Sequence, residues 1–230
     1  MKKITQLEKN FKKFKRLTKE EYFIAKEIKN KVKIREKDTI LDVGCADGKL
    51  SRSLVKDSRN ITFLDVNEFD FSPQEEFIHS SFEKARMNKK YDYILTSHVW
   101  GHFYRNKSFN FCFNKALNLL KENGKLIAIH NSNKDFTGRL IEFSKGIFKK
   151  MEFDVFLEKY LEKADYKEDY FNVKLKAKTY RELAELIQVL IIVPDKLYYK
   201  NIEKIIKFLK DNLKKPEFNI NQRIIVINKN

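Results

Sequence analysis

The stretch Thr39–Leu50, TILDVGCADGKL, holds the residues whose types and spacing best fit a binding site. Its apolar start predicts a buried strand, Gly44 and Gly48 predict a turn, and Lys49–Val55 predicts the beginning of a helix. Such a unit presents free backbone N–H groups at the end of the strand, and glycine lets a ligand approach the main chain closely. Asp42 adds a carboxylate that suits a cationic ligand group. We therefore expect a bulky side chain at Gly44 to abolish ligand binding while most of the fold persists.

A second acidic residue lies at the distance that a ribose site needs. The apolar run Ile61–Val66 contains Asp65, 21 residues after Gly44. In Rossmann-type folds, an acidic residue about 20 positions beyond the glycine turn hydrogen-bonds ribose hydroxyls. The dinucleotide pattern G-x-G-x-x-G is not matched, because Gly44 and Gly48 are four positions apart. The spacing thus makes an NAD enzyme the weakest interpretation.

Asp42, Gly44 and Gly48 form a D-x-G-x-x-x-G pattern. This pattern resembles the first motif of class I S-adenosylmethionine-dependent methyltransferases, and the resemblance extends over about residues 35–133. It implies S-adenosyl-L-methionine as the cofactor, S-adenosyl-L-homocysteine as the product, and Asp65 as the ribose ligand. The cofactor-binding residues that it implies are Asp42, Gly44, Cys45, Ala46, Gly48, Asp65, Val66, Ser81, Phe82, Ser97 and His98.

Later segments continue the resemblance in the same order along the chain. Phe77–Glu83 resembles the third strand and the adenine turn, although Ser80 and Ser81 stand where family members often carry Asp. Further on, the resemblance assigns the fourth strand to Tyr91–Ser97, a helix to Phe109–Leu120, its stop to residues 122–124, and the fifth strand to Lys125–His130.

Methyl transfer from a sulfonium needs alignment and exclusion of water more than a covalent nucleophile. Where the acceptor must lose a proton, a general base within hydrogen-bond reach helps. The candidate bases lie at the carboxyl ends of the fourth and fifth predicted strands: His130, His98 and His102. Aromatic faces attract cations, so Trp100, Phe103 and Tyr104 are candidate substrate-binding residues. Asn131 is a further candidate, because the resemblance implies that the end of the fifth strand faces the acceptor. No closely spaced Cys/His cluster predicts a metal site.

The rest of the chain predicts how these residues are positioned. Residues 4–33 have the periodicity of two helices that meet near Thr18, where Glu21 completes a capping-box pattern. We expect an α/β fold: a three-layer, Rossmann-like, seven-stranded, mostly parallel sheet with helices on both faces and one antiparallel strand near the carboxyl end. The predicted organisation is a single methyltransferase domain, 1–230, with N-terminal helices (1–34), a cofactor-binding core (35–133), a helical lid insertion (134–170) and C-terminal strands and helices (171–230).

The composition limits the partners. The formal net charge is +16, but nine of the 48 basic residues are Arg and the rest are Lys. An AT-rich coding sequence would produce the same abundance of Lys, Asn, Ile and Phe, so a nucleic-acid partner is possible but not favoured. Cys45 and Cys112 do not imply a disulfide framework, and no apolar run approaches the length of a membrane helix. We expect a cytoplasmic protein.

Missing motifs narrow the substrate class. No [D/N/S]-P-P-[Y/F] element follows the fourth predicted strand, and its absence argues against methylation of exocyclic amines of DNA. The chain also contains no Pro-Cys pair, which argues against methylation of cytosine C5 by a cysteine nucleophile. The favoured interpretation is transfer of a methyl group to an O or N atom of a small molecule. An RNA methyltransferase that uses the basic surface and a non-catalytic Rossmann-like binding module remain alternatives. The acceptor and the oligomeric state stay open.

Overall fold

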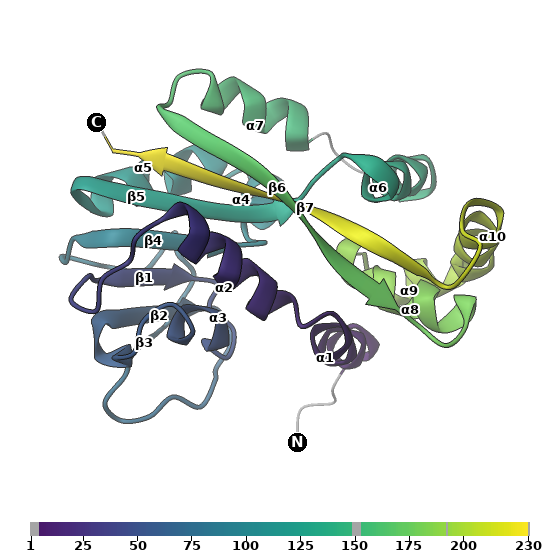
Figure 1. Cartoon of the computed structure of the whole chain (residues 1–230), viewed down its shortest axis with the longest axis horizontal. Helices are drawn as coiled ribbons and strands as arrows, with labels where there is room; N and C mark the ends of the chain where they lie inside the picture. Colours follow the sequence, from purple (N-terminus) through teal and green to yellow (C-terminus); the bar gives the residue numbers. More distant parts are fainter. Residues whose placement is uncertain (1–4, 149–152, 192, 230) are drawn as a thin grey trace. The chain divides into compact units, whose positions relative to one another are not determined.

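The computed structural model describes residues 5–148, 153–191 and 193–229. Strands within these ranges form a seven-stranded sheet in the order β3-β2-β1-β4-β5-β7-β6 (Figure 1). Their bounds are β1 Ile40–Val43, β2 Ile61–Asp65, β3 Glu76–His79, β4 Tyr91–Ser97, β5 Leu120–Asn131, β6 Tyr166–Lys176 and β7 Glu217–Asn228.

The sheet is mostly parallel. Strands β1 to β5 pair in parallel with their neighbours. Strand β7 runs the other way: the N–H of Ser132 donates to Asn221 O, and the N–H of Lys229 donates to Gly124 O, so residue numbers rise on one strand as they fall on the other. The arrow of β7 in Figure 1 shows this reversal between β5 and β6. The predicted sheet, including its single antiparallel strand, is confirmed.

The chain divides into two compact units, which we describe separately. The accessory unit comprises Met1–Glu20, Asn131–Met151 and Asn172–Gln222; the core unit comprises Glu21–His130, Glu152–Phe171 and Arg223–Asn230. The helices of the accessory unit are α1 Gln6–Thr18, α6 Asp135–Phe148, α8 Tyr180–Ile191, α9 Asp195–Lys200 and α10 Ile202–Asn212. Those of the core unit are α2 Glu20–Lys31, α3 Lys49–Arg52, η1 Ser58–Asn60, α4 Trp100–Arg105, α5 Phe109–Leu119 and α7 Phe153–Leu161.

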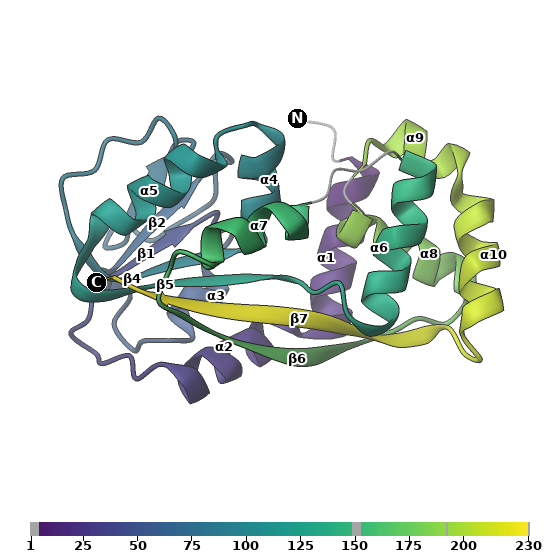
Figure 2. The ribbon, with the colours of Figure 1, turned by 90° about the horizontal axis from the view of Figure 1, so that it is seen from above.

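Alternation along the strands gives the core unit two hydrophobic faces. Leu41 and Val43 of β1 pack with residues of α4, α5 and α7, whereas Ile40 packs with residues of α2 and α3. Figure 2 shows these helices on the two sides of the sheet. The three-layer arrangement predicted from the sequence is therefore confirmed for the core unit.

Some local features differ from the prediction. Residues 122–124 lie inside β5, where the pairing with β4 shifts between Tyr91 and Tyr93 and Asn123 has a φ of 60°. The predicted turn is thus an interruption within a longer strand. The break between α1 and α2 falls at Lys19, which has a φ of 50°, and the capping box observed at α1 joins Thr5 and Glu8.

The predicted insertion contains two helices, α6 in the accessory unit and α7 in the core unit; residues 149–152 of that prediction lie outside the described residues. Its function as a lid stays a prediction. No helix in the described part of the chain has both the length and the apolar character needed to cross a bilayer.

Candidate functional site

The predicted site residues of the core unit gather at the carboxyl ends of adjacent strands. Val43 pairs with Leu64 of β2 on one side and with Thr96 of β4 on the other, and Ser97 of β4 pairs with Ile129 of β5. The strand order reverses between β1 and β4, and such a switch point is where open α/β sheets bind ligands.

The glycine turn after β1 has an unusual backbone. Gly44, Ala46 and Gly48 have φ angles of 73°, 49° and 69°. The N–H groups of Gly44 and Cys45 both donate to Leu64 O, at 2.8 and 3.1 Å, and that of Gly48 donates to Cys45 O. The expectation that the turn presents free N–H groups is therefore wrong for these residues, because β2 and the turn itself already supply their acceptors.

The two glycines are required by the packing of the protein itself. A Cβ on Gly44 would lie 2.2 Å from Val99 Cγ1, and a Cβ on Gly48 would lie 2.7 Å from the ring of Phe63. Both positions also have the left-handed φ that favours glycine. A bulky side chain at Gly44 would thus strain the turn and displace Val99 as well as any ligand. That most of the fold persists in such a variant stays a prediction.

Asp42 lies beneath the turn and is only 2% exposed. Its Oδ2 accepts a hydrogen bond of 2.6 Å from Ser51 Oγ, which fastens β1 to α3. Cys45 is also buried, and burial, followed by the nearby carboxylates of Asp42 and Asp65, raises the pKa of its thiol. A thiol that stays protonated is a poor nucleophile, and Cys45 packs in a hydrophobic cluster of the core unit.

Asp65 joins the first two strand ends. Its Oδ2 accepts from the N–H of Ala46 at 3.0 Å, and its Oδ1 accepts from the N–H of Asn67 at 2.8 Å and from Asn67 Nδ2 at 3.2 Å. The adjacent Val66 is 61% exposed. Asp65 therefore holds the glycine turn in place at the edge of an open surface.

The ends of β2 and β3 are tied together. The N–H of Ser80 donates to Asp65 O, and Nε2 of His79 lies 3.0 Å from Val66 O. Ser81 is half-buried and starts the next turn, with its carbonyl accepting from Lys84 and Ala85. No spacing in the sequence pointed to His79, because only the sheet register brings it opposite Asp65.

Arg52 forms a clasp that the sequence did not reveal. Its guanidinium binds both carboxylate oxygens of Glu75, with Nε–Oε1 at 2.6 Å and Nη2–Oε2 at 2.9 Å, and Nη1 donates to Asp47 O of the glycine turn. The same group lies 5.0 Å from the ring centroids of Phe63 and Phe71. The clasp connects the glycine turn to the loop between β2 and β3.

The loop after β4 carries Ser97, which is half-buried, and His98, which has a φ of 59°. The N–H of His98 donates to Ile129 O at 2.8 Å, so the loop is anchored to β5. His130, the last residue of β5 in the core unit, is 7% exposed and meets the ring of Phe153 edge-on at 5.9 Å.

His102 lies on the surface of α4, with Nδ1 3.2 Å from Arg105 Nη2. Partial desolvation, followed by repulsion from the Arg105 guanidinium, lowers the pKa of His102, which favours the neutral imidazole. A neutral imidazole can accept a proton, so this electrostatic setting is compatible with a general base.

The predicted aromatic residues differ in burial. Trp100 and Phe103 are 4% and 9% exposed, and Phe82, which the resemblance assigned to the cofactor, is 2% exposed. The rings of Phe82 and Phe103 lie 6.0 Å apart in the hydrophobic core. Tyr104 is half-buried, with its ring 4.6 Å from that of Phe156.

Asn131, the last residue of β5, is half-buried and belongs to the accessory unit. Within the described ranges, no group of three or more His, Cys, Asp or Glu side chains is arranged to hold a metal ion.

Comparisons with known proteins agree with this geometry. A family model described as a methyltransferase domain matches residues 14–173, more than half of the chain. A search of curated proteins found no match.

Solved structures share the fold at low sequence identity. A protein of Bacillus halodurans C-125 (BH2331), named as a methyltransferase, is 16% identical, has a TM-score of 0.57, and covers 89% of this chain and 98% of its own. The YcgJ protein of Bacillus subtilis is 12% identical, with a TM-score of 0.61 and coverage of 90% and 98%. A protein of an antibiotic biosynthesis pathway in Anabaena variabilis ATCC 29413, also named as a methyltransferase, is 14% identical, with a TM-score of 0.63 and coverage of 90% and 96%.

The family model, the strand order and the glycine turn with its acidic partner on the next strand lead to one assignment. The chain belongs to the class I S-adenosylmethionine-dependent methyltransferases.

Proposed function

We propose that this protein transfers a methyl group from S-adenosyl-L-methionine to an O or N atom of a small molecule. The observation that carries the proposal is the hydrogen bond between Asp65 and the N–H of Ala46, which joins the glycine turn to the acidic end of β2 beside the switch point. When bound, the cofactor supplies an electrophilic methyl group on a sulfonium. The protein's own task is to bind, orient and exclude water.

The carboxylate of Asp65 fits a ribose hydroxyl. A carboxylate offers about four acceptor positions, and the three hydrogen bonds from Ala46 and Asn67 leave one for a ligand donor. Val66 follows Asp65 in the chain, and Ser81 follows Ser80, whose N–H donates to Asp65 O. Val66 and Ser81 would contact the adenosine end of the cofactor. The turn from Gly44 to Gly48, with Asp42 beneath it, would receive the methionine end.

The acceptor side is proposed at the ends of β4 and β5. His130, His98 and His102 are the candidates for holding the acceptor's proton, and Ser97 and His98 border the cofactor. Tyr104 and Asn131 are proposed contacts of the acceptor. The burial of Phe82, Trp100 and Phe103 supports a role beneath the site, where they fix the loop that carries the exposed groups.

Calorimetric titration of the purified chain with S-adenosylmethionine, S-adenosylhomocysteine and NAD tests the proposal. We expect micromolar binding of the first two and none of NAD, and a screen of small-molecule acceptors would then seek turnover. Absence of binding to all three would overturn the proposal. An RNA methyltransferase would instead turn over RNA with a steep salt dependence, and a non-catalytic module would bind without turnover.

Substitution of Asp65 tests the ribose contact. We expect Asp65→Ala to weaken cofactor binding by about 1–3 kcal/mol, because polar hydroxyls lose their acceptor. The same change removes the acceptor of the Ala46 N–H, so the variant's folding must be verified by circular dichroism before titration. Unchanged affinity in a folded variant would remove Asp65 from the site.

A further inference from the structure

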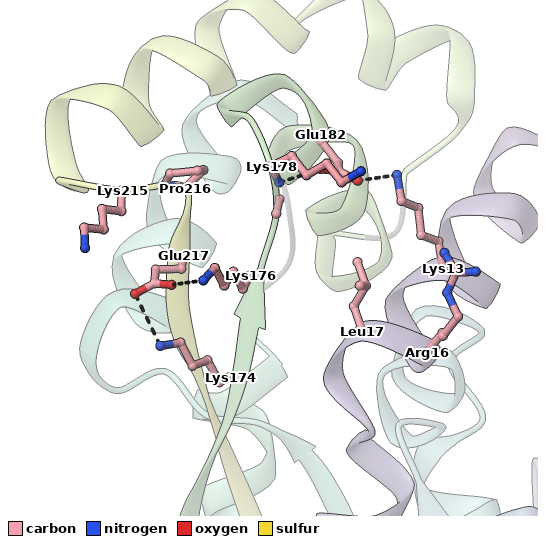
Figure 3. A pocket seen from close by; sticks show the side chains of 11 residues that line it. Lys13, Arg16, Leu17, Lys174, Lys176, Lys178, Glu182, Lys215, Pro216 and Glu217 are labelled. Carbon is pink, nitrogen blue, oxygen red and sulfur yellow. Dashed lines mark hydrogen bonds and ion pairs between the residues drawn. The ribbon is translucent and has the colours of Figure 1, made fainter.

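One groove of the accessory unit concentrates positive charge. It encloses about 720 Å³ and is lined by Lys13, Arg16, Leu17, Lys174, Lys176, Ala177, Lys178, Glu182, Lys215, Pro216 and Glu217 (Figure 3). Six of these eleven residues are Lys or Arg, whereas the whole chain has 48 in 230. The general abundance of lysine therefore does not account for the density of cations here.

Three stretches that are distant in sequence supply the cations: residues 13–16, residues 174–178 and residue 215. Lys13 and Arg16 come from α1, Lys174 and Lys176 from the edge strand β6, Lys178 from the turn before α8, and Lys215 from the turn before β7. Figure 3 shows them spread along the groove, with α1 at one end and Lys215 at the other. An extended chain of anions would engage all of them, which a single small anion would not.

The two carboxylates of the groove neutralise only part of this charge. Glu182 binds Lys13 Nζ at 2.5 Å, and Glu217 lies 3.3 Å from Lys174 Nζ and 4.0 Å from Lys176 Nζ. The remaining three cations are exposed: Arg16, Lys178 and Lys215. Within the described residues, these three side chains form no ion pair with a carboxylate.

The hydrogen-bonding character of the lining favours a phosphate chain over a peptide. Lys and Arg side chains are donors only, and both glutamates already accept from lysines. The lining contains no Ser, Thr, Asn, Gln or Tyr side chain, so its only side-chain acceptors are the two glutamates. A phosphodiester backbone needs donors alone. Leu17, Ala177 and Pro216 add apolar surface that sugars and bases can cover.

We propose that this groove binds single-stranded nucleic acid through its phosphate backbone. Because its lining holds no amide side chain that could read base edges, binding is independent of sequence. The inference stands apart from the proposed methyl transfer, since it concerns the accessory unit and is measured without cofactor.

Fluorescence anisotropy of a labelled 12-nucleotide oligouridine with the full chain tests the proposal. We compare the wild type with the triple variant Arg16→Ser/Lys178→Ser/Lys215→Ser, which leaves every ion pair of the groove in place. The matched control, Lys26→Ser/Lys29→Ser/Lys33→Ser, removes the same charge from exposed positions of the core unit. Thermal melting verifies that both variants are folded.

We expect the groove variant to lose at least about tenfold in affinity at low salt. The slope of its log affinity against log salt should be shallower by about 2, because it lacks three cations and each phosphate contact on a single strand contributes about 0.7 to the slope. The control should stay near the wild type. Equal losses in the two variants would show that net charge alone drives binding and would overturn the site. Absence of oligouridine binding, or equally effective competition by polyglutamate of the same charge, would overturn the proposed ligand.

Discussion

The clasp between Arg52 and Glu75 should make the stability of the core unit depend on acid pH. Hydrogen bonds from Arg52 lower the pKa of Glu75 from its ordinary value of 4.5 to about 2. The Glu75 side chain is 6% exposed, and it also accepts from the N–H of Ser72. A pKa difference of this size corresponds to about 3 kcal/mol of folding free energy.

The sign follows from the direction of the change. Because the folded pKa lies below the unfolded one, the stabilisation is complete above about pH 4.5 and is lost as the pH falls towards 2. We expect Glu75→Gln, which imitates the protonated carboxyl, to cost about 2–3 kcal/mol at pH 7 and progressively less below pH 4.5.

Urea unfolding at a series of pH values measures this difference between variant and wild type. The control is Glu36→Gln, because the ion pair of Glu36 with Lys56 is exposed on both sides (69% and 89%) and should contribute little. A Glu75→Gln penalty that does not change between pH 7 and pH 3, or one no larger than that of the control, would refute the argument.

Three further changes test the geometry of the core unit. Gly44→Ala should lower the free energy of unfolding by at least about 1 kcal/mol, because Gly44 has a positive φ. Adding Val99→Ala to the same chain should restore part of this loss in urea unfolding, and an absence of rescue would contradict the contact with Val99. Burial raises the thiol pKa of Cys45 and raises that of Cys112 to about 11. Iodoacetamide at pH 8, followed by mass spectrometry, should therefore label both thiols far more slowly in the native than in the unfolded protein. Fast labelling of the native protein would show that the thiols are accessible. Arg223→Met should lower the melting temperature and reduce the free energy of unfolding by about 1–3 kcal/mol, because Glu158 and Glu168 lose their shared hydrogen-bond donor. An unchanged melting temperature would show that these two contacts do not stabilise the protein.

The sequence predicted most elements of the core unit, because their signals are local. Buried strands such as Ile61–Asp65 are short apolar runs, and the turn after Val43 is marked by glycines that its left-handed backbone requires. The start of β5 before the turn at residues 122–124 was not predicted, because a strand that resumes across an irregularity looks locally like the end of a helix followed by a new strand.

The candidate site was only partly predictable. Its chemistry-bearing residues, among them Asp42, Asp65 and His130, stand out by type and position in the sequence. Their partners do not: Ser51 for Asp42 and the Ala46 N–H for Asp65 are visible only once the turn is folded. Burial likewise separated Trp100 and Phe103 from the more accessible Tyr104, although all three belong to one short segment.

By itself, the sequence determined the class of fold and the position of the glycine turn, since both depend on residue periodicity and on backbone conformations that few residue types allow. Only the tertiary structure decided that Val99 excludes a side chain at Gly44, that Arg52 clasps Glu75, and that cations from α1, β6 and two turns line one groove. These contacts join residues that are distant in the chain. Their formation depends on which strands become neighbours in the sheet, and no local pattern of residues records that choice.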